Sequence, residues 1–279
     1  MIVTLSKTYT GHGGKLLEDK SREIDSTRKR WDEHAEKYDE WYKTFHGAVE
    51  HYVDWELLRE HLPQNRDARI LDAGGGTGRI TLPLAKMGYA VTLCDISPGM
   101  LNVARQKLLK AGVLDKVEIC ECDVNKLRFA DESFDFVLCW DGMAEAAEEL
   151  IRVTKKGGKI SIFLVNKHGA AIRKFSENAT SALALLRSKS GYVYDEEEKY
   201  KAVSVEEASE LFEKKGVRVN EIYAVCGMLD LLSIPREIQE SHSWDKKFFD
   251  QVTEMLLRLS KEPSVKGLSK HLVLYGKRI

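Results

Sequence analysis

The sequence has few prolines and few cysteines, and it contains no long hydrophobic run. Proline and cysteine each account for 5 of the 279 residues. The cysteines, at positions 94, 120, 122, 139 and 226, match neither a disulfide framework nor metal-ligand spacing, so we expect buried thiols and no metal site. No stretch reaches the roughly 20 apolar residues of a membrane helix, and the N-terminus lacks the apolar core of a secretory signal. We therefore expect a cytoplasmic protein with no membrane partner.

The sequence also lacks an excess of charge of either sign. Its formal net charge is −1, with 43 Lys and Arg residues against 44 Asp and Glu residues. A nearly neutral chain has no global attraction for nucleic acid or for an anionic membrane surface. The composition, with 43% hydrophobic and 31% charged residues, is that of an ordinary globular protein.

Hydrophobic strand-like runs alternate with helical runs through the middle of the chain. This order is typical of a parallel sheet built from right-handed crossovers. The pattern predicts an α/β fold that is Rossmann-like and doubly wound, with a mostly parallel sheet. We expect strands at 69–73, 90–94, 117–122, 134–140, 159–165, 217–225 and 271–276, and helices at 79–87, 98–111 and 143–153.

The chain outside this core is less regular. Apolar spacing predicts helices around Trp31–Phe45 and over 48–62, 170–187 and 246–260, with a loop at 189–202. Ser204 and Glu207 form a capping box that predicts a helix ending near Gly216.

Residues 70–78 read ILDAGGGTG, a hydrophobic strand followed by a glycine-rich turn that leads into a helical run. Such a corner binds nucleotides in doubly wound folds. The dinucleotide fingerprint needs glycines at i, i+2 and i+5, but the third position after Gly74 and Gly76 is Arg79, and after Gly76 and Gly78 it is Thr81. The missing glycine argues against a nicotinamide dinucleotide enzyme.

The remaining pattern, D-x-G-x-G-x-G over 72–78, resembles the loop of class I S-adenosylmethionine (SAM) methyltransferases. Residues 130–164 are similar to the fourth strand, helix and Gly-Gly turn of the ubiquinone-type methyltransferase superfamily, and WDEHAEKYDEW at 31–41 is similar to its N-terminal helix. The resemblance implies SAM as cofactor and S-adenosylhomocysteine as product. It also implies a seven-stranded sheet whose last strand is antiparallel.

The residues expected to hold SAM lie at the ends of successive strands. Asp72 is placed to hold the ammonium group, and Asp95, at the end of the next strand, can accept both ribose hydroxyls. Helix capping for Asp95 and turn formation for Asp123 are the plain alternatives. The full set of expected cofactor-binding residues is Tyr38, Asp72, Gly74, Gly75, Gly76, Gly78, Asp95, Ile96, Met100, Asp123, Val124 and Trp140.

Several members of this set face the adenine or follow from the resemblance alone. Met100 offers an apolar wall, the Asp123 carboxylate can accept from the adenine amino group, and the Val124 amide can donate to a ring nitrogen. The resemblance implies that Tyr38 and Trp140 contact SAM. Lid packing is the alternative for Tyr38, because aromatic stripes at helical spacing usually lie in a core.

The expected reaction is an in-line displacement at the methyl carbon, in which the protein mainly aligns and desolvates the partners. A carboxylate or thiolate acceptor needs no base, whereas a phenol, hydroxyl or amine acceptor would benefit from one. His168, just beyond the fifth strand, is the first candidate base, and Asp141, beside Trp140, is the second. The alternatives are a solvent-facing histidine and a helix-capping aspartate.

A closer resemblance is to the tRNA 5-carboxymethoxyuridine methyltransferases, through DAGGGTG, LCDIS, NKHG at 166–169 and the tail at 261–278. That family methylates a carboxylate on a modified wobble uridine. Three departures weaken this reading. Glu50 and Cys226 stand where the family pattern has arginines, and Asp195–Glu198 fall within its Lys/Arg-rich segment. A carboxylate or phosphate ligand would favour those positive charges.

These observations divide the chain into a mobile leader (1–24), cap helices (25–63) and a SAM-binding domain (64–279) with lid insertions at 166–203 and 227–268. We expect a methyltransferase that acts on a small-molecule acceptor. Two alternatives stay open: a tRNA wobble-uridine carboxyl O-methyltransferase, and a SAM-binding or SAM-sensing protein without activity.

Overall fold

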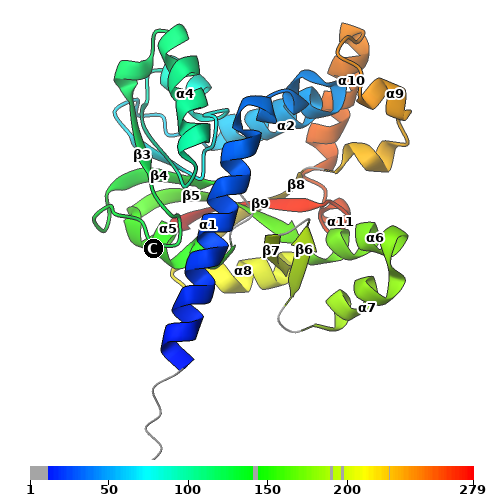
Figure 1. Ribbon diagram of the computed structural model, residues 1–279. Helices are drawn as coiled ribbons and strands as arrows, with labels where there is room; N and C mark the ends of the chain where they lie inside the picture. Colours follow the sequence, from blue (N-terminus) through cyan, green and yellow to red (C-terminus); the bar gives the residue numbers. More distant parts are fainter. Residues whose placement is uncertain (1–11, 141–143, 189–190, 196–197, 226) are drawn as a thin grey trace, which may run out of the picture.

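The computed structural model describes residues 12–140, 144–188, 191–195, 198–225 and 227–279. In this part of the chain a central sheet is covered by helices on both faces (Figure 1). The fold is therefore the doubly wound α/β fold that the alternation of strands and helices predicted.

Seven of the nine strands in the described part of the sheet pair in the order β3-β2-β1-β4-β5-β9-β8. The first five run parallel, while β9 lies between β5 and β8 and is antiparallel to both. The predicted antiparallel last strand is thus confirmed. The strands are β1 (Arg69–Ala73), β2 (Ala90–Asp95), β3 (Val117–Glu121), β4 (Phe134–Cys139), β5 (Thr154–Asn166), β8 (Val217–Val225) and β9 (His271–Arg278).

Two further strands correct the expected loop at 189–202. Strands β6 (Tyr192–Asp195) and β7 (Glu198–Val203) form an antiparallel hairpin, and β7 continues the sheet by pairing with the end of β5. Aromatic and β-branched residues at 192–194 favour this extended structure. The acidic run that follows them obscured the strand signal in the sequence.

Helices on the two faces bury separate hydrophobic clusters. One cluster is formed with α2 (Phe45–His61), α3 (Thr81–Lys86), α4 (Pro98–Lys110) and α10 (Lys246–Leu259), and the other with α5 (Ala147–Val153) and α8 (Val205–Glu213). The sheet strands read as continuous apolar runs because both of their faces are buried. The remaining α-helices are α1 (His12–Tyr38), α6 (Lys167–Glu177), α7 (Ala179–Arg187), α9 (Arg236–Gln239) and α11 (Pro263–Lys266), and the short 3₁₀ helices are η1 (Trp41–Lys43), η2 (Leu114–Lys116), η3 (Ala144–Ala146) and η4 (Leu229–Leu232).

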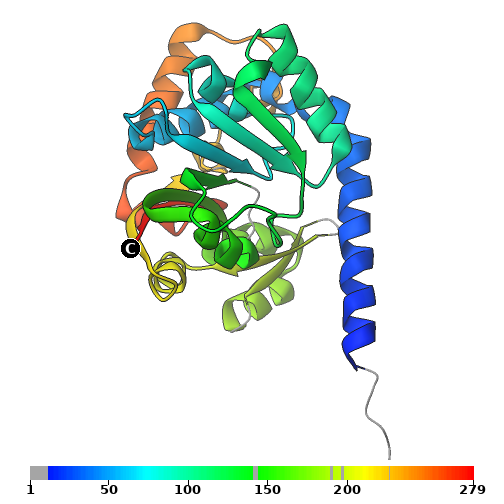
Figure 2. The ribbon, with the colours of Figure 1, turned by 90° about the vertical axis from the view of Figure 1, so that its left-hand side faces the viewer.

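Helix boundaries follow local capping chemistry. The predicted capping box of Ser204 and Glu207 is present at the start of α8. The single helix expected at 170–187 is divided at Asn178, whose side chain accepts a hydrogen bond from the Ser181 amide and so starts α7. At the N-terminus, α1 begins at His12, so residues 12–24 of the expected leader are helical. Figure 2 shows α1 running along one side of the molecule.

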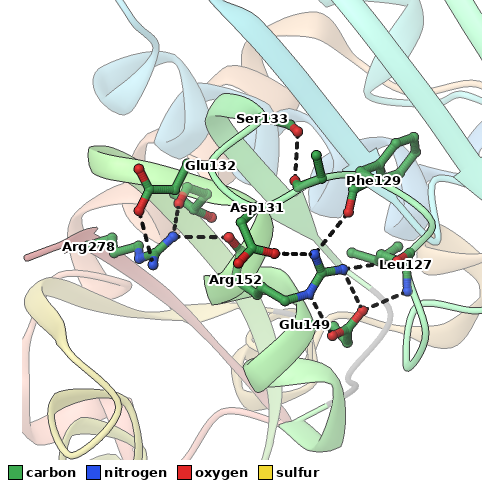
Figure 3. Close-up of polar contacts among 10 residues, drawn as sticks. Leu127, Phe129, Asp131, Glu132, Ser133, Glu149, Arg152 and Arg278 are labelled. Carbon is green, nitrogen blue, oxygen red and sulfur yellow. Dashed lines mark hydrogen bonds and ion pairs between the residues drawn. The ribbon is translucent and has the colours of Figure 1, made fainter.

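The Arg152 buttress is a network of hydrogen bonds around Arg152, next to the amino ends of β4 and β5 (Figure 3). Five bonds from the Arg152 guanidinium reach the Glu149 and Asp131 carboxylates and the backbone carbonyls of Leu127 and Phe129. Arg278 donates to the carbonyls of Arg152 and Thr154. This cluster holds the connection into β4 against α5 and β9.

Candidate functional site

The glycine loop leaves β1 in a conformation that favours glycine. Gly74, Gly76 and Gly78 have φ angles of 70°, 52° and 72°, in the region where a side chain is strained. The amides of Gly74 and Gly75 donate to the Cys94 carbonyl at 2.8 and 3.2 Å. These bonds fix the loop against the end of β2.

Gly75 and Gly76 are glycines for different reasons. A Cβ on Gly75 would lie 2.4 Å from Leu93 Cδ1 and 2.6 Å from Asp72 Oδ2, so the loop packs too tightly for any side chain. A Cβ on Gly76 would instead clash with nothing and would lie at van der Waals distance, 4.0 Å, from both Asp95 Oδ2 and Met100 Sδ. The loop, the acidic end of β2 and the start of α4 therefore surround one space, and three of the predicted cofactor residues meet there.

Asp95 is held in place by the backbone. One carboxylate oxygen accepts from the Gly76 amide and the other from the Ser97 amide, each at 2.9 Å. Burial raises the pKa of Asp95 above its ordinary value. The capping role considered for Asp95 belongs to Ser97, whose hydroxyl accepts from the Met100 amide at 3.0 Å. The half-buried Ile96 lies between them.

Asp72 lies beneath the loop rather than on its open side. Its Oδ2 accepts from the Thr81 hydroxyl at 2.6 Å, and the residue is 2% exposed. Burial raises the pKa of Asp72 to about 6. These contacts give Asp72 a structural role in joining β1 to α3, and its contact with the SAM ammonium stays a prediction.

Asp123 and Val124 follow β3 next to Asp95, because the Cys122 amide donates to the Asp95 carbonyl at 2.9 Å. Asp123 Oδ1 accepts from both nitrogens of Asn125, which is the turn role that the sequence left open. Val124 is buried. The adenine contacts proposed for this pair stay predictions.

Trp140 and Tyr38 each pack against neighbouring side chains. Trp140 donates from Nε1 to the Ser161 hydroxyl at 2.9 Å and stacks on Phe163 with a ring distance of 4.5 Å. Tyr38 makes edge contacts with Trp31 and Tyr42, as expected for lid packing. Their contact with SAM also stays a prediction.

Sequence reasoning missed two aspartates that dock α1 and the segment after it. Asp32 accepts from the Ser97 hydroxyl and the Gly99 amide at 2.6 and 2.7 Å. Asp39 accepts from the Thr77 hydroxyl at 2.7 Å and from Lys107 at 2.6 Å. Both lie in the WDEHAEKYDEW segment, so the acidic residues of that segment were the available signal.

A second missed group surrounds Arg79, just after the glycine loop. Arg79 Nη1 lies 3.0 Å from His51 Nδ1 and 3.5 Å from Asp54 Oδ2, and the guanidinium stacks over the Tyr42 ring at 4.6 Å. Burial and the nearby positive charges of Arg79 and Lys107 lower the pKa of His51 to about 4. This group connects the glycine loop to the middle of α2.

The two predicted catalytic residues gain no support. His168 is exposed in the first turn of α6, where its amide donates to the Asn166 side chain at 3.2 Å. Asp141 lies outside the described residues, as does Cys226. Both catalytic roles stay predictions. In the described part of the chain, no three His, Cys, Asp or Glu side chains are grouped to hold a metal ion.

No helix within the described ranges is long and apolar enough to cross a bilayer.

A family model described as a methyltransferase domain matches residues 70–158, from β1 into β5. This range contains the glycine loop, Asp95 and Asp123.

Two curated relatives extend the match. The chain is 30% identical over 177 residues to the ubiquinone/menaquinone biosynthesis C-methyltransferase UbiE of Pseudomonas aeruginosa (strain LESB58), which spans 60% of this chain and 68% of that enzyme. It is 31% identical over 153 residues to the tRNA 5-carboxymethoxyuridine methyltransferase of Escherichia coli (strain K12), spanning 50% of this chain and 58% of that enzyme.

A SAM-dependent methyltransferase from Thermotoga maritima shares the fold, with a TM-score of 0.54, 20% identity, and coverage of 89% of this chain and 98% of that one. The residues present fit the cofactor. Gly76 has no Cβ, and a Cβ there would occupy the space beside Asp95 and Met100 that the cofactor needs. The chain therefore belongs to the class I SAM-dependent methyltransferases and is an enzyme that uses SAM.

Proposed function

We propose that this enzyme methylates a small-molecule acceptor. One observation carries the proposal: the match to the ubiquinone/menaquinone biosynthesis C-methyltransferase UbiE covers 68% of that enzyme, whereas the match to the tRNA-modifying relative covers 58% of that enzyme. The net charge of −1 supports the same acceptor class, because tRNA binding depends on Lys and Arg that neutralise phosphates.

The roles proposed for the chain follow from the contacts of the glycine loop. When bound, SAM supplies a methyl group activated by its sulfonium. Asp95, fixed by two backbone amides, would accept from the ribose, and Gly76 leaves room for the close approach.

Transfer from methyl-labelled SAM tests the acceptor class. The enzyme is incubated with a cell extract that has been separated into small molecules and tRNA, and the label is followed in each fraction. We expect label in the small-molecule fraction only. Alkali-labile label in tRNA would instead support the wobble-uridine alternative. SAM binding with label in neither fraction would support a SAM-binding protein without activity.

Two glycine variants test the proposed cofactor site. Gly76 and Gly88 both have positive φ, 52° and 95°, but a Cβ on Gly88 would meet nothing within 4 Å. Gly76→Ala and Gly88→Ala should each lose about 1–2 kcal/mol of stability through backbone strain. Only Gly76→Ala should weaken S-adenosylhomocysteine binding, by about tenfold or more in calorimetry. Equal affinity in the two variants would place the cofactor elsewhere.

A further inference from the structure

Three cysteines gather where β2 and β3 end, on the sheet face that α5 and α8 cover. Cys94 of β2 is the register partner of Cys120 of β3, and Cys122 comes directly after the last residue of β3. All three pack in one hydrophobic cluster. Cys94 and Cys122 are buried, as the sequence predicted, while Cys120 is half-buried. The three thiols are not arranged to hold a metal ion.

Cys120 has the features of a reactive thiol. The thiolate is the form that attacks peroxides, and it is favoured at partly exposed positions next to hydrogen-bond donors and positive charge. Hydrogen bonds from the Cys122 and Cys94 thiols, and to a lesser extent the positive charge of Arg128, lower the pKa of Cys120. Hydrogen bonding with Cys120 raises the pKa of both Cys94 and Cys122. The cluster therefore favours one thiolate beside two thiols.

Cys94 is better placed than Cys122 to form a disulfide with Cys120. A disulfide joins residues whose Cα atoms are about 4.4–6.8 Å apart. Neighbouring strands lie about 4.8 Å apart, so the register partners Cys94 and Cys120 fall inside this range. Residues at i and i+2 of an extended chain are about 6.6–7.2 Å apart, so Cys120 and Cys122 lie at its outer limit.

Cys94 also belongs to the backbone that supports the glycine loop. Its carbonyl accepts from the Gly74 and Gly75 amides at 2.8 and 3.2 Å, and Asp95 is the next residue in the chain. A disulfide needs Cβ atoms about 3.8 Å apart, which is closer than the spacing of neighbouring strands. Forming the bond to Cys120 therefore moves the end of β2, and with it the loop and Asp95.

We propose that Cys120 is a peroxide-reactive thiol that forms a disulfide with Cys94, and that this bond weakens cofactor binding. The Cys120 thiolate attacks hydrogen peroxide: an S–O bond forms, the O–O bond breaks, and the released hydroxide takes up a proton to become water. The Cys94 sulfur then attacks the sulfenic acid: an S–S bond forms, the S–O bond breaks, and hydroxide leaves with the Cys94 proton as water. The two sulfurs lose two electrons in all, and peroxide is reduced to water.

Peptide mapping after mild peroxide treatment tests the bond. Trypsin releases Cys94 in peptide 87–105, and it releases both Cys120 and Cys122 in peptide 117–126. Without reductant we expect the two peptides to be joined, with a mass lower than their sum by two hydrogens. A disulfide confined to peptide 117–126, or no disulfide at all, would overturn the proposal.

Variants assign the reacting thiol. Cys120→Ser should abolish the cross-link, and Cys94→Ser should leave a sulfenic acid on Cys120 that dimedone labels. Cys139→Ser is the matched control, because Cys139 is buried in the same cluster at the end of β4, and this variant should keep the cross-link. A cross-link that persists in Cys120→Ser would assign the reaction to Cys122 and reject the proposal.

Calorimetry with S-adenosylhomocysteine measures the effect on the cofactor site. The cross-linked protein should bind about tenfold or more weakly than the reduced protein, and dithiothreitol should restore the affinity. This recovery distinguishes the disulfide from a sulfoxide at Met100, whose reduction requires an enzyme. Cys120→Ser should keep its affinity after peroxide treatment. Unchanged affinity in the cross-linked protein would reject the effect on the cofactor. Because no methyl acceptor is present, these results do not depend on the proposed small-molecule function.

Discussion

Asp54 and His51 lie less than one turn apart on α2, and burial shifts their pKa values in opposite directions. Burial, and to a lesser extent the charge of Glu50, raise the pKa of Asp54 to about 7 against the opposing effect of Arg79. Burial and the positive charges of Arg79 and Lys107 lower the pKa of His51 to about 4. Both shifts favour the neutral form in the folded protein.

These shifts predict how stability depends on pH. Between about pH 4 and 7 the folded protein keeps the Asp54 proton that the unfolded chain has lost, so this group makes stability fall as pH rises. Between pH 6.5 and about 4 the unfolded chain protonates His51 and the folded protein does not, so this group makes stability fall as pH drops.

Denaturant unfolding of single variants at several pH values separates the two effects. Asp54→Asn should gain stability relative to the wild type as pH rises from 4 to 7, by on the order of 2–4 kcal/mol. His51→Gln should gain relative stability as pH falls from 6.5 to 4. A pH-independent difference between either variant and the wild type would rule out the corresponding shift.

At the scale of elements, acidic side chains dock α1 onto the glycine loop and α4. Asp39 contacts Thr77, which is 1% exposed, and also Lys107 of α4. The hydrogen bond to Thr77 joins the end of the N-terminal segment directly to the loop expected to bind SAM. We therefore expect this hydrogen bond to fix the position of α1 and to contribute little to the stability of the sheet.

Replacing Asp39 should release this docking. In Asp39→Ala we expect faster amide hydrogen exchange over residues 24–38 with unchanged exchange in β1, because the sheet keeps its own hydrogen bonds. Glu36→Ala is the control, since Glu36 is exposed on the same helix. Identical exchange of α1 in the two variants would mean that Asp39 does not hold the helix.

Element positions in the core were predictable because each strand there is a short apolar run between a helix and a turn. Helix α4 was expected at 98–111 and spans Pro98–Lys110, capped by Ser97. The prediction was wrong at the β6–β7 hairpin, because that hairpin is stabilised by pairing with the end of β5. Pairing of strands far apart in sequence leaves no periodic signal of its own.

At the scale of the whole molecule, the carboxyl ends and the amino ends of the parallel strands have different roles. The carboxyl ends of β1 and β2 carry the glycine loop and Asp95, while the amino ends of β4 and β5 carry the Arg152 buttress (Figure 3). The Glu149 and Asp131 carboxylates raise the pKa of Arg152 further above its ordinary value, so its charge is permanent. Stability and cofactor binding should therefore be separable by mutation.

Arg152→Met tests this separation. The change removes five hydrogen bonds and leaves the Leu127 and Phe129 carbonyls without that partner, so it should cost about 2–4 kcal/mol of unfolding free energy. S-adenosylhomocysteine affinity of the folded fraction should not change. Arg258→Met is the control, because Arg258 forms an exposed ion pair with Glu254 and should cost about 0–1 kcal/mol. A large loss of S-adenosylhomocysteine affinity in Arg152→Met would show that the two ends of the strands are coupled.

The sequence by itself determined the class of fold, the SAM cofactor and which residue types stand at the ends of β1 and β2. The glycine spacing at 74–78 and the acid at Asp95 belong to local segments, and their backbone requirements can be read from neighbouring residues. Only the tertiary structure decided that Asp72 lies beneath the loop, that Asp32 and Asp39 dock α1, and that Asp54 meets Arg79. The physical reason is that burial and pairing depend on residues distant in the chain, and a carboxyl group has the same appearance in sequence whether water or an apolar cavity surrounds it.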